Sequence, residues 1–92
     1  MTLQKLFSKK KNWTQEAYAR NAKGDIVTPL SEDAVCWCLM GAMQKCYPSA
    51  KKRFRVLDRI KSLLPGGRVV GFNDRQDQTI KGIRRLVKQA NV

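Results

Sequence analysis

The sequence predicts an α+β fold in which three main helices pack on a small two- or three-stranded antiparallel sheet. Three stretches carry apolar residues at helical spacing, and short extended runs flank turn-forming residues. The chain has 92 residues, so residues 1–92 are expected to form a single domain. A chain of this length buries roughly 60–65% of its unfolded surface, and we therefore expect a small core.

The N-terminal region predicts one short helix within residues 1–10. Leu3, Leu6 and Phe7 lie on one side of it, although so short a helix is marginal without packing. Residues 1–12 as a whole are rich in lysine, and we expect them to be a basic, mobile segment.

A β-hairpin is predicted from residues 17–20 and residues 26–28. The segment between them, residues 21–25, contains Asn, Gly and Asp, which favour turns. Pro29 then ends the extended run.

Residues 31–47 are expected to form a central, buried helix. Ser31 is a typical N-cap, and Glu32 and Asp33 lie in the first turn, where the helix dipole favours acids. The helix is expected to end before Pro48. Its apolar residues recur at helical spacing: Val35, Cys38, Leu39, Ala42 and Cys46.

A second long helix is predicted over residues 49–64. Ser49 is its N-cap, and the Pro-Gly-Gly sequence at residues 65–67 ends it. Residues 68–72 contain adjacent valines and predict a short strand. A last helix follows, capped by Asn73 or Asp74, with an apolar stripe of Ile80, Ile83, Leu86, Val87 and Ala90.

The chain is strongly basic. It carries 19 Lys and Arg against 7 Asp and Glu, a net charge of +12. Most of the excess lies in residues 45–92, which hold 13 of the basic residues and 3 of the acids. Such a field attracts anions, so we expect a polyanionic partner: the phosphate backbone of RNA or DNA, or an acidic protein groove.

The first candidate site is the start of the helix at residues 49–64. Cations in the first turns oppose the helix dipole by about 0.3–1 kcal/mol each, whereas free N–H groups and cations together suit a phosphate. The alternative is that these side chains extend into water in a chain that is basic throughout. The candidates are Lys51, Lys52, Arg53, Arg55 and Arg59.

Two further clusters are candidates for contacts with nucleic acid or a partner. The last helix carries Lys81, Arg84, Arg85 and Lys88, and the N-terminal segment carries Lys9, Lys10 and Lys11. Both are also explained as solvated faces. If several of these groups neutralise phosphates together, binding must weaken steeply with salt.

Residue types needed for catalysis or metal binding are scarce. The chain has no His, and Cys36, Cys38 and Cys46 are too few and too far apart on a helix to share a metal ion. A nucleophilic cysteine would lack an imidazole base, so we expect free thiols that pack as small hydrophobic groups. Asp74 and Asp77 are a candidate carboxylate pair, but helix capping explains them equally well. We expect no enzymatic activity, no metal and no cofactor.

The sequence also bears on location. No apolar run approaches the roughly 20 residues that a spanning helix needs. The polar N-terminus lacks the apolar segment of a secretory signal. We therefore expect a cytoplasmic protein without a membrane partner.

Three aromatic residues bear on the site. Trp37 and Trp13 are expected in the core. Phe54 lies between Arg53 and Arg55, where it would be able to stack on a base or a partner surface. Packing beneath the hairpin is the interpretation that we favour.

Several motifs resemble an uncharacterised family of small phage and bacterial proteins. They are Trp13-x4-Tyr18-Ala19-Arg20, Gly24, Ala34-Val35-Cys36-Trp37-Cys38-Leu39-Met40-Gly41-Ala42, Phe72-Asn73-Asp74 and Thr79. The resemblance covers residues 13–90. It implies a shared fold and a phage-related setting, but no activity. The basic residues at 51–59 depart from the family pattern.

Size, charge and this setting are similar in kind to those of the anti-CRISPR inhibitors. We therefore expect a phage-encoded, non-enzymatic inhibitor that binds a host CRISPR ribonucleoprotein, made of effector proteins and guide RNA, and blocks target DNA binding. The alternative is a small sequence-specific DNA-binding transcriptional regulator, because the helices at 31–47 and 49–64 are joined by a short turn. Against it, the second helix is poor in the Asn, Gln and Ser residues that read base edges.

Overall fold

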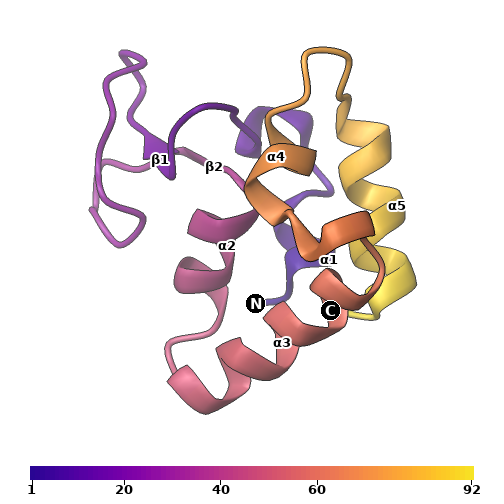
Figure 1. Cartoon of the computed structure of the whole chain (residues 1–92). Helices are drawn as coiled ribbons and strands as arrows, with labels where there is room; N and C mark the ends of the chain where they lie inside the picture. Colours follow the sequence, from indigo (N-terminus) through magenta and orange to yellow (C-terminus); the bar gives the residue numbers. More distant parts are fainter.

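The computed structural model describes residues 1–92 and confirms the α+β class (Figure 1). Helices α2, α3 and α5 are the three main helices, and β1 pairs with β2 in a two-stranded antiparallel sheet. The order along the chain is α1 (Leu3–Leu6), the 3-10 turn η1 (Lys10–Asn12), β1 (Ala19–Arg20), β2 (Cys36–Trp37), α2 (Leu39–Cys46), α3 (Ala50–Ser62), the 3-10 turn η2 (Pro65–Gly67), α4 (Val69–Asn73) and α5 (Ile80–Ala90).

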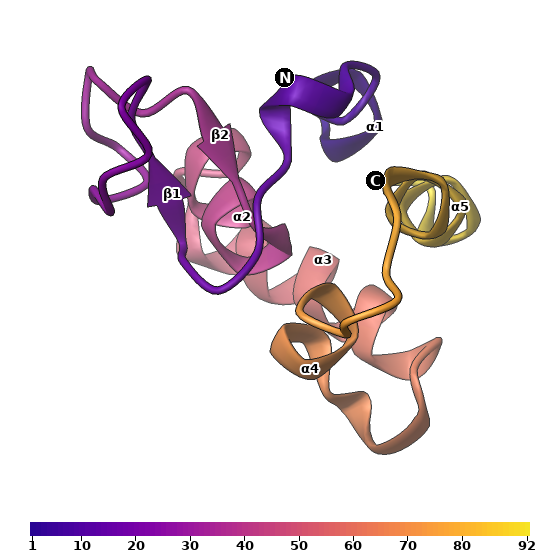
Figure 2. The same ribbon diagram turned by 90° about the horizontal axis from the view of Figure 1, so that it is seen from above.

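The sheet and its loops lie at one side of the molecule and α5 lies at the other (Figures 1 and 2). Helices α2 and α4 lie between them and contact each other, and α3 runs along the lower edge of the molecule in Figure 1. The core is one cluster of 18 buried residues. Leu3, Leu39, Ile60 and Ile83 are fully buried in it and come from four different helices. Burying a side chain of this size contributes about 1.5–3 kcal/mol.

The N-terminal segment contributes to this core. Leu3 and Phe7 are fully buried, and the N–H of Gln4 donates to the carbonyl of Val92 over 3.1 Å. The expected short helix is present as α1, where the hydroxyl of Thr2 accepts from the N–H of Lys5. The first seven residues are thus held against α2 and α5, whereas the sequence suggested a mobile segment.

The helix expected over residues 31–47 forms only in its second half. Residues 32–33 form a turn, and Cys36 and Trp37 form β2, which pairs with β1 in the register Ala19–Trp37 and Arg20–Cys36. The indole N–H of Trp37 donates to the carbonyl of Pro29 over 2.9 Å. Pairing across the chain therefore overrides the local helical pattern, and Glu32 and Asp33 do not lie in a first helical turn.

The expected second hairpin strand is also absent. Only an isolated antiparallel bridge joins Arg20 to Ile26, so residues 26–28 do not form a strand. Gly24 does make the expected turn, with φ at +86°. Strand β2 pairs with one edge of β1, and the bridge to Ile26 lies at its other edge.

Residues 68–72 form helix α4 rather than a strand. Val69 and Asn73 are four residues apart on one face of α4, and both are buried. Helix α5 begins later than expected, because its N-cap is Thr79, whose hydroxyl accepts from the N–H of Gly82. Asn73 and Asp74 make other bonds. The long helix at 49–64 is confirmed as α3, with Ser49 as its N-cap.

Asn73 joins three segments that are far apart in the sequence. Its side chain is fully buried, and its carbonyl oxygen accepts from the indole N–H of Trp13 over 2.9 Å and from the N–H of Leu39 over 3.1 Å. Its amide group donates to the carbonyl of Thr14 over 3.1 Å and to the carboxylate of Asp74 over 2.8 Å. All four bonds available to a primary amide are therefore made.

We predict that Asn73→Ala lowers the free energy of unfolding by about 2–4 kcal/mol, because it leaves two buried donors without an acceptor. Urea unfolding followed by circular dichroism measures this. Gln89→Ala, at an exposed residue of α5 whose side chain makes no hydrogen bond, is the control. A loss for Asn73→Ala no larger than that of the control would contradict the central role of Asn73.

Gly41 allows close packing of α2 on the segment before β1. A Cβ atom at this position would overlap the carbonyl oxygen of Tyr18. We predict that Gly41→Ala costs about 1–3 kcal/mol in unfolding free energy, because backbone rather than a flexible side chain must move. Gly71→Ala in α4 is the matched control, since its Cβ would meet the nearest atom of Arg68 at 3.7 Å. Equal effects of the two substitutions would argue against the close approach.

Candidate functional site

The exposed stripe of α3 carries the strongest candidate among the predicted clusters. Lys52, Arg55 and Arg59 lie at helical spacing on one side of α3 and are exposed. With Val56 and Asp58 they line an open groove of about 590 Å³. The helical rise places the first and last of these cations about 10 Å apart along the helix axis. Exposed Lys51 lies beside them, and we call Lys51, Lys52, Arg55 and Arg59 the α3 basic surface.

Arg53 points elsewhere. Its guanidinium donates to the carbonyls of Tyr47 and Pro48 over 2.9 and 3.2 Å, so it fixes the turn that leads into α3. Lys52 is partly restrained as well, because its ammonium lies 5.5 Å from the ring centroid of Tyr47. Two of the cations at the start of α3, Lys52 and Arg53, therefore also help to hold the turn that precedes the helix.

No acid neutralises the α3 basic surface. The one ion pair in the structure joins Arg75 and Asp77 over 3.1 Å, and both of its side chains are exposed. Asp58 lines the same groove, but it lies beyond ion-pair distance of any cation. The surface therefore keeps its charge for an external anion.

The cations of α5 divide into two groups. Arg84 donates to the carbonyls of Phe7 and Ser8 over 2.8 and 2.7 Å, and this fixes the chain that follows α1. Lys81, Arg85 and Lys88 are exposed and make no ion pair or hydrogen bond through their side chains. Arg84 therefore stabilises the fold through these two hydrogen bonds, whereas the other three cations of α5 remain unpaired.

The lysines at the N-terminus are exposed at η1. Lys11 lines a cavity of about 450 Å³ together with Lys45, which lies far away in the sequence. The ammonium of Lys45 lies 5.7 Å from the ring centroid of Trp37. Lys9 and Lys10 line none of the cavities described here.

Two of the three aromatic expectations hold. Trp37 is buried, on β2 rather than in a helix, and Trp13 packs against the core. The expectation for Phe54 was wrong. Its side chain is 65% exposed on α3, so it does not lie beneath the hairpin and is free to contact a partner.

All three cysteines are free thiols. Cys38 is buried and caps α2, because its sulfur accepts from the N–H of Gly41 over 3.4 Å. Burial raises the pKa of the Cys38 thiol above its usual value, and the negative charge of Asp74 adds to the shift. Burial also raises the pKa of Cys46. No group of three or more Cys, Asp or Glu side chains is placed to hold a metal ion.

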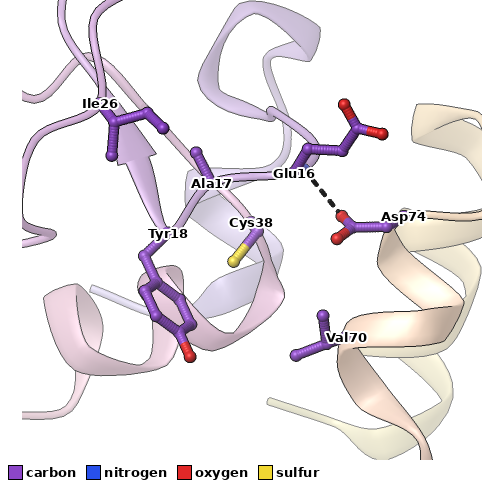
Figure 3. Close-up of a pocket in the computed structure, with 7 residues that line it drawn as sticks. All are labelled: Glu16, Ala17, Tyr18, Ile26, Cys38, Val70 and Asp74. Atoms are coloured by element: carbon purple, nitrogen blue, oxygen red, sulfur yellow. Dashed lines mark hydrogen bonds between the residues drawn. The ribbon is translucent and has the colours of Figure 1, made fainter.

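A cavity of about 480 Å³ near Cys38 was not expected from the sequence. It lies between residues 16–18 and α4, and the sulfur of Cys38 points toward it (Figure 3). The lining residues are Glu16, Ala17, Tyr18, Ile26, Cys38, Val70 and Asp74. Three of them, Tyr18, Cys38 and Asp74, belong to the motifs of the family resemblance, and this was the one signal in the sequence that pointed here.

Hydrogen bonds to the end of α4 position this cavity. Gln15 donates through its side-chain amide to the carbonyls of Asn73 and Arg75, both over 2.9 Å. The N–H of Glu16 donates to one oxygen of Asp74 over 2.9 Å. Glu16 adopts a left-handed conformation with φ at +62°, which is uncommon for a residue other than glycine.

Fold and surface together define a small α+β protein with a basic surface on α3 and an acid-lined cavity beside Cys38. The chain matches a family of unknown function, DUF6197, over residues 4–91, and it belongs to that family. This confirms the expected membership of an uncharacterised family. No curated protein and no solved structure was found to match the chain. None of the helices has the length and apolar character needed to cross a bilayer.

Cys38 is predicted to be a slow thiol. In the double variant Cys36→Ser, Cys46→Ser, iodoacetamide should alkylate Cys38 at least about tenfold more slowly near pH 8 than in the same variant unfolded in urea, because both burial and the raised pKa disfavour the thiolate. Mass spectrometry follows the reaction. Equal rates in the folded and unfolded protein would contradict this placement of the thiol.

Proposed function

We propose that this protein is a non-enzymatic binding protein that docks on a nucleic-acid-containing complex through the α3 basic surface. The observation that carries the proposal is the row of Lys52, Arg55 and Arg59, exposed along one side of α3 with no acid in ion-pair contact. Phosphate oxygens suit such a row, since Arg and Lys donors form charge-assisted hydrogen bonds with them.

The exposed Phe54 supports the same proposal. It projects from α3 about one helical turn after Lys51, on a different side of the helix from Lys52 and Arg59, and an exposed aromatic ring near a basic residue suits stacking on an unpaired base. The exposed cations Lys81, Arg85 and Lys88 of α5, and Lys9, Lys10 and Lys11 at the N-terminus, extend the positive field over the rest of the molecule. They are secondary contacts in this proposal.

The specific complex that we propose is a host CRISPR ribonucleoprotein, which would make this protein a phage-encoded inhibitor of the anti-CRISPR type, acting in the host cytoplasm. What supports this is the small size, the net charge of +12 and the family resemblance. Docking of the α3 basic surface on the phosphate backbone of the guide RNA, or on an acidic groove of the effector proteins, would exclude target DNA. A sequence-specific DNA-binding regulator remains the second candidate, because α2 and α3 are joined by only three residues, 47–49.

We predict that Arg55→Glu, Arg59→Glu weakens binding to a short fluorescent single-stranded RNA by at least about tenfold and flattens its salt dependence. Fluorescence anisotropy at several salt concentrations measures both. Arg53 is left unchanged because its bonds hold the turn before α3. The matched control is Lys23→Glu, Arg75→Glu, which changes the net charge equally away from α3. If the control loses as much affinity, the effect is one of net charge and the α3 basic surface is not the site.

A second experiment distinguishes the two candidate classes. Tagged protein is recovered from host cells that carry CRISPR systems, with and without nuclease treatment. Recovery of one defined effector complex that survives nuclease supports the inhibitor. A large affinity gap between one DNA duplex and random duplex at fixed salt supports the regulator instead.

A further inference from the structure

We propose that the cavity beside Cys38 is a docking site for an extended, basic segment of a protein partner. The segment would place an Arg or Lys side chain against Asp74 and Glu16 and a neighbouring apolar side chain against Tyr18, Ile26 and Val70. This surface differs from the α3 basic surface in residues and in charge, and the proposal does not depend on the proposed function.

The apolar part of the surface is unusually exposed for a small protein. Tyr18, Ile26 and Val70 are 51%, 67% and 48% exposed, and the buried thiol of Cys38 lies at the base of the cavity between them (Figure 3). Tyr18 and Ile26 lie on the two sides of the turn at Gly24, and Val70 comes from α4, far away in the sequence. Large apolar side chains gathered around one hollow are typical of a surface that a partner covers.

The charge at this cavity is opposite to the net charge of the protein. In a chain of net charge +12, two of the seven acids lie here. One oxygen of Asp74 accepts from the N–H of Glu16 and from the amide of Asn73, but the other makes no hydrogen bond within the chain. The carboxylate of Glu16 has no partner either, and neither acid forms an ion pair. The two unpaired carboxylates complement a cationic group and repel a phosphate.

The backbone along the wall of the cavity favours a peptide over an isolated amine. The N–H and C=O of Ala17 and the N–H of Tyr18 make no hydrogen bond within the chain. An extended segment would satisfy such groups through its own main chain while its side chains enter the hollow. Tyr18 and Ile26 are more than half exposed and Val70 nearly so, and the hollow is therefore an open surface rather than an enclosed pocket of the kind that small ligands favour.

The test is a titration of the ¹⁵N-labelled full chain with the peptide acetyl-Val-Arg-Val-amide, followed by NMR. We expect shifts at Glu16, Ala17, Tyr18, Val70 and Asp74, with affinity near the millimolar range expected of so small a ligand. The charge-reversed peptide acetyl-Val-Glu-Val-amide should bind at least about tenfold more weakly. Equal binding of the two peptides, or shifts outside the cavity, would overturn the proposal.

Two variants locate the contact. Asp74→Asn keeps an oxygen that can accept from the N–H of Glu16 but removes the charge, and Val70→Arg fills the cavity with a cation of the chain itself. Both should weaken the Arg peptide several-fold, and the dispersion of the NMR spectrum reports the fold. Arg55→Glu, Arg59→Glu should leave peptide binding unchanged, which separates this site from the α3 basic surface. If Asp74→Asn binds as the parent does, or if butylguanidine alone binds as tightly as the peptide, the cavity is not a peptide site.

Discussion

The buried side chain of Asn73 fixes how three segments of the chain are arranged relative to one another. It connects the segment that leads to β1, the start of α2 and the end of α4, and it does so with every hydrogen bond that its amide can make. A buried amide without partners would be costly, so these segments are bound to one relative arrangement. The neighbouring Asp74 then holds Glu16, which closes one side of the cavity. The hydrogen bonds of Asn73 and Asp74 therefore hold both the core segments and the wall of the cavity in place.

The distribution of charge divides the molecule into two kinds of surface. Most cations lie on α3, on α5 and near the N-terminus, and they face solvent without acidic partners. The cavity beside Cys38 is the second kind of surface. There the unpaired acids Glu16 and Asp74 lie beside exposed apolar side chains. A protein that contacts both phosphate and polypeptide within one complex would use such an arrangement, because the two surfaces cannot compete for the same ligand.

Arginine serves two purposes in this chain, and the presence or absence of hydrogen bonds to main-chain carbonyls separates them. Arg53 and Arg84 donate to main-chain carbonyls at the ends of helical segments, where a cation also complements the helix dipole. Arg55 and Arg59 also lie on a basic helix, but their side chains contact only solvent and the groove on α3. From sequence spacing alone, all four arginines were predicted to contact nucleic acid or a partner. Spacing indicates which face of a helix a residue occupies, but not which main-chain carbonyl lies within reach of its side chain.

Local patterns in the sequence were enough to predict the α+β class, the position of α1, the length and cap of α3, the apolar face of α5 and the basic character of the surface. These features follow from local spacing, capping residues and composition, which act within a few residues of the chain. The strand at Cys36 and Trp37, the helix at residues 69–73 and the meeting of Tyr18, Cys38 and Asp74 around one cavity became visible only in the folded chain. Each of them rests on contacts between segments that are 16 to 60 residues apart, and no local pattern encodes a contact at that distance.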